Sequence, residues 1–77
     1  MYKLIEYFEE NDNVTWHLVD YAETKNEIDK RKIEIAKELN DMGIETLEVI
    51  VTKNINSLKK ILKRADTKIF QVIKSDT

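Results

Sequence analysis

The chain has 77 residues, of which 42% are hydrophobic and 36% charged, and it contains neither cysteine nor proline. This length allows one small domain, and the lack of cysteine excludes disulfides and thiolate metal sites as sources of stability. The net charge of −2 hides an uneven distribution, because residues 1–50 carry 6 basic and 13 acidic side chains whereas residues 51–77 carry 7 basic and 2 acidic. We expect a single small α/β domain over residues 1–77, frayed in its last few residues, with a dipolar surface.

Targeting and membrane signals are missing from the sequence. No apolar run of about 18 residues could span a bilayer, and no signal-type leader follows Met1. We therefore expect a cytoplasmic protein without membrane attachment. Isoleucine, lysine and asparagine are abundant while alanine, glycine and arginine are scarce. This bias is typical of AT-rich coding sequences, including those of many phages and mobile elements.

The first two predicted elements are strands. Residues 2–9 and 14–22 are rich in aromatic and β-branched side chains, and a polar run separates them. This pattern predicts a β-hairpin.

A helix is predicted next. Thr24 and Glu27 have the spacing of a capping box, and Gly43 stands where a left-handed C-terminal cap belongs. Between them an apolar stripe recurs at helical spacing. Its members are Ile28, Ile35, Ala36, Leu39 and Met42.

The remaining elements are a strand, a short helix and a strand. Residues 45–52 alternate in the manner of a strand, Asn54 can cap the second helix, and residues 67–74 form the last strand. The apolar face of the second helix consists of Ile55, Leu58, Ile61, Leu62 and Ala65.

This order, β-β-α-β-α-β, predicts an α+β fold. We expect a two-layer α/β sandwich with a four-stranded mixed sheet, and two right-handed crossovers that place both helices on one face. The predicted sheet contribution to the core is Val14, Trp16, Leu18, Leu47, Val49 and Val51. Its helical contribution is Ile28, Ile35, Leu39, Leu58, Ile61 and Leu62.

The opposite sheet face would then be uncovered. Alternation sends Val19, Tyr21 and Ile50 there with His17, and the outer strands add further aliphatic and aromatic side chains. Such a patch exceeds what a soluble monomer usually exposes, so we expect a homodimer.

Residues that carry chemistry are sparse. His17 is the single histidine, and regular alternation places its nearest carboxylate in the strand, Asp20, on the other face. Gly43 is the single glycine, which excludes glycine-rich phosphate loops. We expect no enzyme activity, no catalytic residues, no cofactor and no metal.

Two surfaces are candidates for binding. Acids beside aromatic side chains on the hairpin are typical of a protein-binding surface, although they could instead mimic nucleic-acid phosphates or serve as solubilising edge charges. The predicted partner-binding residues are Tyr7, Glu9, Glu10, Asp12, His17, Val19 and Tyr21. A basic stretch is the candidate nucleic-acid surface, or simply a solvated helix face. Its residues are Lys59, Lys60, Lys63, Arg64 and Lys68.

The leading hypothesis is a small intracellular protein-binding module that acts stoichiometrically on a protein partner, such as a phage or mobile-element inhibitor or accessory protein. The alternative is a nucleic-acid-binding or regulatory protein that uses the basic C-terminal half.

Overall fold

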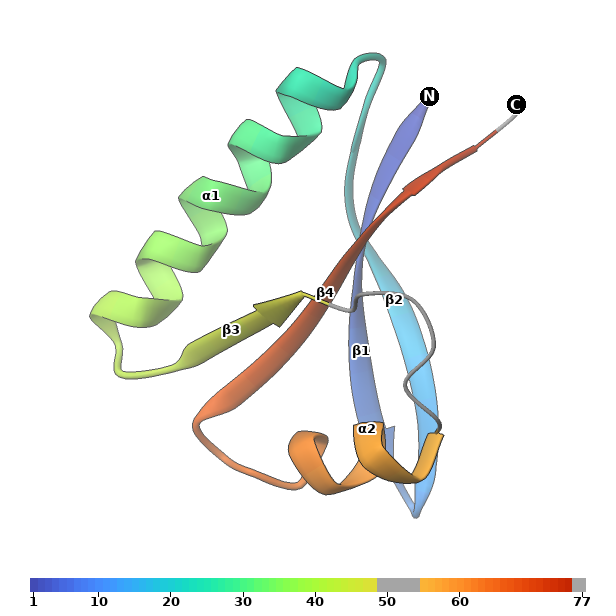
Figure 1. Ribbon diagram of the computed structural model, residues 1–77, viewed down its shortest axis with the longest axis vertical. Helices are drawn as coiled ribbons and strands as arrows, with labels where there is room; N and C mark the ends of the chain where they lie inside the picture. Colours follow the sequence, from blue (N-terminus) through green and yellow to red (C-terminus); the bar gives the residue numbers. More distant parts are fainter. Residues whose placement is uncertain (49–54, 76–77) are drawn as a thin grey trace.

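Four strands form one mixed sheet accompanied by two helices (Figure 1). The computed structural model describes residues 1–48 and 55–75. The elements are β1 (Tyr2–Glu10), β2 (Asn13–Ala22), α1 (Lys25–Asp41), β3 (Glu45–Glu48), α2 (Ile55–Leu62) and β4 (Thr67–Lys74). The predicted fold class and element order are confirmed.

A two-residue turn connects β1 to β2. Asn11 and Asp12 have φ angles of 52° and 67°, in the left-handed region that asparagine and aspartate tolerate better than most residues. Two successive residues of this kind indicate a type I′ turn, whose twist matches that of the flanking strands. The Asp12 N–H donates to Glu9 Oε1 at 3.0 Å, which ties the turn to β1.

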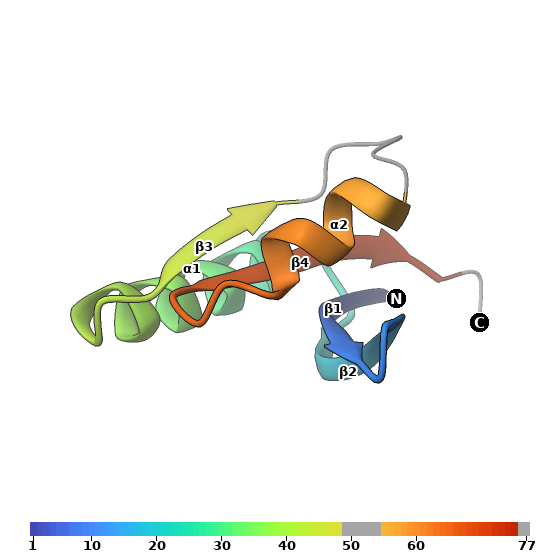
Figure 2. The ribbon, with the colours of Figure 1, turned by 90° about the horizontal axis from the view of Figure 1, so that it is seen from below.

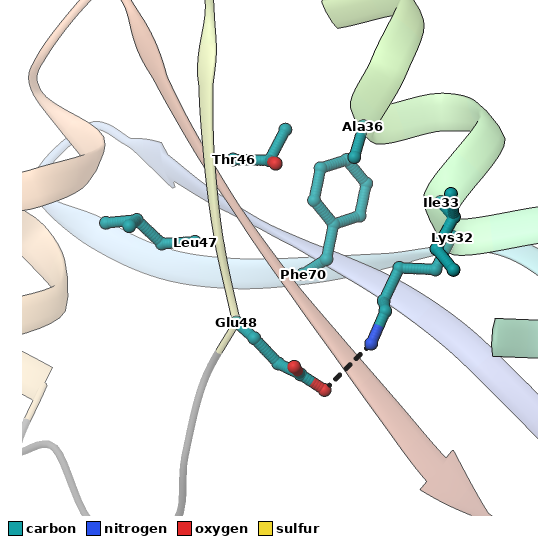
Figure 3. A pocket seen from close by; sticks show the side chains of 7 residues that line it. All are labelled: Lys32, Ile33, Ala36, Thr46, Leu47, Glu48 and Phe70. Atoms are coloured by element: carbon teal, nitrogen blue, oxygen red, sulfur yellow. Dashed lines mark hydrogen bonds and ion pairs between the residues drawn. The ribbon is translucent and has the colours of Figure 1, made fainter. Parts of the chain in front are cut away.

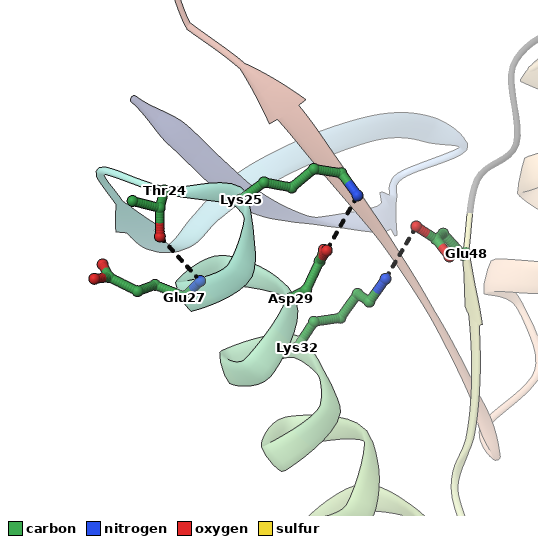
Figure 4. A network of polar contacts seen from close by, with 6 residues as sticks. All are labelled: Thr24, Lys25, Glu27, Asp29, Lys32 and Glu48. Carbon is green, nitrogen blue, oxygen red and sulfur yellow. Dashed lines mark hydrogen bonds and ion pairs between the residues drawn. The ribbon is translucent and has the colours of Figure 1, made fainter.

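Both ends of α1 are capped by the residues that the sequence predicts. The Glu27 N–H donates to Thr24 Oγ1 at 3.2 Å at the start of the helix (Figure 4). At its end, Gly43 has a φ of +82°, its N–H donates to the Asn40 carbonyl at 3.0 Å, and the Ile44 N–H donates to the Leu39 carbonyl at 2.9 Å. These two bonds form a Schellman motif and turn the chain into β3.

The strand order in the sheet is β2-β1-β4-β3. β1 is antiparallel to both β2 and β4, while β3 runs parallel to β4. The C-terminal strand β4 is therefore inserted between β1 and β3. As a result, the crossover from β2 to β3 through α1 runs across the sheet in one direction, and the crossover from β3 to β4 through α2 runs back.

This reversal changes the placement of the helices. Right-handed crossovers that run in opposite directions place their helices on opposite faces of a sheet. The two helices accordingly lie on either side of β4 (Figures 1 and 2). The expectation of both helices on one face is wrong, because it assumed two crossovers in the same direction.

The principal core lies between α1 and the sheet. Leu4 of β1, Ile28 of α1 and Phe70 of β4 form a buried cluster. Partly buried side chains pack around this cluster: Tyr2, Ala22, Ile35, Leu39 and Val72. Ile28, Ile35 and Leu39 occupy the core as predicted, whereas Met42 at the helix end is 71% exposed and is not a core residue.

The other sheet face has a smaller buried region. Ile5 is adjacent to Leu4 in β1, and Ile69 is adjacent to Phe70 in β4. Both therefore point to the opposite face, and both are buried. Leu58 of α2 is buried as predicted. Trp16 and Leu18 are not in the core, contrary to the prediction, because β2 lies at the sheet edge. Val49, Ile50, Val51 and Asn54 lie outside the described residues.

Ile28 provides a test of this core. We expect Ile28→Ala to lower the free energy of unfolding by about 2 to 5 kcal/mol, through lost burial and a residual cavity. Denaturant unfolding followed by circular dichroism measures the change. Ile33→Ala is the matched control, because Ile33 lies on the same helix, is 64% exposed, and should change stability by no more than about 0.5 kcal/mol. Equal losses in both variants would contradict the assigned helix face.

Candidate protein-binding surface

The largest exposed apolar side chains of the sheet lie on β2. Trp16 is 57% exposed, Leu18 50% and Tyr21 60%. We call these three residues the apolar row. β2 has β1 on one side only, so its outer edge is a sheet edge (Figure 2). Isolated exposed apolar side chains are ordinary, whereas a row of them along one edge strand is a candidate interaction surface.

A β-bulge places these three side chains on the same face. Leu4 pairs with Asp20 and Ile5 pairs with Leu18, which leaves Val19 as the extra residue in β2. Trp16, Leu18 and Tyr21 pair with Tyr7, Ile5 and Lys3, which are alternate residues of β1. Regular alternation would have separated Leu18 from Tyr21. The bulge therefore assembles the row.

The same bulge corrects a prediction about His17. Glu6 pairs with His17 and Leu4 pairs with Asp20, so His17 and Asp20 share the face that α1 partly covers. They were expected on opposite faces. Asp20 is nevertheless engaged elsewhere, because Arg31 Nε donates to its Oδ2 at 3.0 Å and the Tyr21 N–H donates to its Oδ1 at 2.8 Å.

The predicted partner-binding residues do not form a single surface. Tyr7 and Tyr21 lie on the face of the apolar row, and the Tyr7 hydroxyl donates to Gln71 Oε1 at 2.5 Å. His17 lies on the other face, where its ring meets the Phe8 ring edge to face at a centroid distance of 4.5 Å. Val19 is partly exposed at the bulge. The remaining predicted residues, Glu9, Glu10 and Asp12, lie at the hairpin end.

The acids of the hairpin end are partly neutralised within the molecule. Asp12 lies between two lysines of the α2 region, with Lys59 Nζ at 3.8 Å from Oδ2 and Lys63 Nζ at 3.4 Å from Oδ1. Glu9 accepts the N–H of the turn, and Glu10 is exposed. Of these three acids, only Glu10 is without a bond to the turn or to a lysine among the described residues.

The predicted nucleic-acid surface is compensated in the same way. Lys59 and Lys63 face Asp12, and Lys68 Nζ lies 3.5 Å from Glu6 Oε2. Within residues 1–48 and 55–75, Lys60 and Arg64 make no ion pair, and both are exposed. Three of the five basic residues thus have a carboxylate partner, with Asp12 shared by two of them, which lowers the positive potential available to phosphates.

A small pocket lies between α1 and β3, with the Phe70 ring directed toward Ala36 at its base (Figure 3). Its volume is about 160 Å³, below the roughly 300 to 1,000 Å³ of most ligand sites. Lys32 Nζ lies 3.1 Å from Glu48 Oε1 at this pocket and links α1 to β3 (Figures 3 and 4). The pocket is too small to enclose a drug-sized molecule.

The described residues contain neither a metal-binding cluster nor a membrane-spanning helix. No three histidine, aspartate or glutamate side chains come together in a way that could hold a metal ion. No described helix is long and apolar enough to cross a membrane.

Comparison of the chain with protein-family models, with curated proteins and with solved structures gives no match. The candidate site therefore depends on the geometry alone. Sequence reasoning missed Trp16 and Leu18 as surface residues, because their spacing of two is the same for a core strand and for an exposed edge strand. Only the strand order separates the two cases.

The Asp12 contacts generate a prediction about stability. We expect Asp12→Asn to lower the free energy of unfolding by about 0.2 to 1 kcal/mol at low salt, since exposed ion pairs contribute little and are screened. Asparagine also tolerates the left-handed backbone, so the turn itself should persist. Urea unfolding at two salt concentrations measures the effect. Glu10→Gln, which removes a neighbouring unpaired charge, is the control and should leave stability and its salt dependence unchanged.

Proposed function

We propose that this protein is a small protein-binding module whose binding surface is the apolar row of β2. The observation that carries this proposal is that three apolar side chains, each at least half exposed, lie on one face of an edge strand. Aromatic side chains supply large contact area at low entropic cost, and they dominate the energy of protein interfaces.

The surroundings of the row support the same proposal. Charged side chains are depleted at the centres of protein interfaces and enriched at their rims. No Asp, Glu, Lys or Arg occurs between Val14 and Val19, whereas the hairpin end beyond them carries Glu9, Glu10 and Asp12. Asp12 is balanced by Lys59 and Lys63, so the rim carries charges of both signs, which suits a protein partner with a polar border around an apolar cleft.

The action of such a module is stoichiometric occupation of its partner. The described residues offer an exposed row and pockets of about 160 to 320 Å³, and the proposal requires no chemistry from them. The compensation of Lys59, Lys63 and Lys68 by carboxylates makes nucleic-acid binding the weaker alternative. We also propose that the protein is cytoplasmic. In keeping with its composition, we propose that it is an inhibitor or accessory protein of a phage or mobile element.

Affinity capture tests the proposed function. The full chain is immobilised and exposed to a lysate of the cells that naturally contain it, and bound proteins are quantified by mass spectrometry. We expect Trp16→Lys to reduce capture of the specific partner at least tenfold, because the substitution removes the aromatic anchor and buries an unpaired charge in the interface.

Met42→Lys is the matched control for this experiment. Met42 is 71% exposed, lies at the end of α1 away from β2, and receives the same change of charge. Capture by this variant should equal that of the natural chain. Equal capture by the Trp16→Lys variant, with an unchanged circular dichroism spectrum, would remove the row from the binding surface. Capture that depends on nucleic acid and falls steeply with salt would favour the alternative function.

A further inference from the structure

Among the described residues, no strand pairs with the outer edge of β2 over residues 14–18. A two-residue turn makes its flanking residues, Glu10 and Asn13, a hydrogen-bonded pair, and such pairs then alternate along the ladder. Thr15 and His17 therefore bond to β1, whereas Val14, Trp16 and Leu18 direct their N–H and C=O groups away from the sheet. We call residues 14–18 the open edge.

Both ends of the open edge have a structural limit to pairing. At one end the chain enters the Asn11–Asp12 turn. At the other end Val19 forms the bulge, and Asp20 Oδ1 takes the N–H of Tyr21 at 2.8 Å. Bulges and charged side chains are devices that prevent pairing at an edge strand. Here they limit pairing to five residues centred on Trp16.

Within these five residues no such protection is present. The open edge has the sequence Val-Thr-Trp-His-Leu, without lysine, acid or proline. The opposite edge of the sheet, β3, begins with Glu45 and ends with Glu48 in a strand of four described residues. The unprotected edge is thus the one that also carries the apolar row.

We propose that a second copy of this chain occupies the open edge. Two β2 strands pair antiparallel around a two-fold axis at Trp16, and the two sheets join into one continuous sheet of eight strands. In this register Val14 faces the partner's Leu18, and Trp16 faces the partner's Trp16. The proposal rests on the proposed function in one respect, namely that β2 is an interaction surface.

The geometry of the open edge favours a second copy. The residues with outward N–H and C=O groups, at 14, 16 and 18, are symmetric about Trp16, so each outward pair can exchange both of its hydrogen bonds. The two-fold axis keeps the apolar rows of both copies on the same face, where apolar side chains oppose one another. A preformed strand also loses less conformational entropy on pairing than a free peptide would.

Charge does not oppose this pairing. Beyond the open edge, Asp12 of one copy approaches the end of the other strand near Asp20. Each of these carboxylates already has its own cations, with Lys59 and Lys63 at Asp12 and Arg31 at Asp20. The neutral centre and the compensated ends leave no net like-charge contact across the axis.

The available area predicts a weak dimer. Within the open edge, the exposed parts of Trp16 and Leu18 amount to roughly 200 to 250 Å² per copy. Stable complexes bury about 800 Å² per partner. Backbone hydrogen bonds and the neighbouring side chains add to the row, but we expect an association that depends on concentration in the micromolar range.

Cysteine cross-linking tests the register. The chain contains no cysteine, so introduced thiols have no internal competitor. In the proposed register residue 15 faces residue 17 of the other copy as a non-hydrogen-bonded pair, whose Cα separation of about 4.5 Å allows a disulfide. Chains with Thr15→Cys and chains with His17→Cys are mixed and mildly oxidised. We expect cross-linked heterodimer at several times the yield that either variant gives alone.

A Met42→Cys chain mixed with the Thr15→Cys chain is the control, because Met42 is exposed and far from the open edge. Equal yields in all mixtures would overturn the proposal. Thr15 and His17 lie on the face away from the apolar row, so both variants retain Trp16. Their circular dichroism spectra show whether each variant folds, and the unoxidised mixture should dissociate on dilution.

A second measurement uses Trp16, the single tryptophan, as a probe. With rising concentration its fluorescence should shift to shorter wavelength, while sedimentation shows a mass approaching twice 9.1 kDa. Trp16→Lys should weaken association at least tenfold and Met42→Lys should not. A monomer at all concentrations up to about 1 mM, with partner capture intact, would overturn the dimer alone. A dimer that captures no partner would overturn the proposed function alone.

Discussion

The antiparallel pairing of β1 with β4 determines where the other elements lie. This pairing joins the two ends of the chain, and the Ser75 N–H donates to the Met1 carbonyl at 2.8 Å beyond the last residues of the ladder. Because β4 occupies one side of β1 and the hairpin fixes β2 on the other, β3 cannot pair with β1, and it pairs with β4 at the far edge. The second crossover must then reverse direction, and α2 lies on the face opposite to α1. Each face receives one helix, and neither is covered completely.

The charge asymmetry along the sequence is a consequence of the same arrangement. The basic α2 region lies next to the acidic hairpin end, with Lys59 and Lys63 on either side of Asp12, and Lys68 of β4 faces Glu6 of the adjacent strand. A strong separation in sequence becomes a set of short contacts in space. These exposed pairs add little to stability individually, but they orient the short helix against the hairpin and reduce the dipole that the sequence alone suggests.

Local signals in the sequence were sufficient to predict the helices and strands, but not to predict which elements lie next to one another in the fold. The Thr24 cap, the Gly43 stop and the strand over residues 67–74 follow from side-chain chemistry within a few residues, and the structure confirms them. The helix faces and the exposure of Trp16 depend on strand order, which is a property of the whole chain. The bulge at Val19 has no local marker, since it contains neither glycine nor an unusual polar residue. It reversed the relation between His17 and Asp20, and with it the composition of each sheet face.

The two edge strands of the sheet, β2 and β3, differ in how far they are protected from pairing with other chains. An edge strand of a small domain is exposed to pairing with other chains unless charges, bulges or short length prevent it. β3, over its described residues, carries a glutamate at each end, and these charges protect it from pairing. β2 is protected only beyond Leu18, where the bulge and Asp20 act together and Arg31 holds the carboxylate in place. The proposed pairing of residues 14–18 in one register requires a strand of this kind, with a protected end beside an unprotected centre.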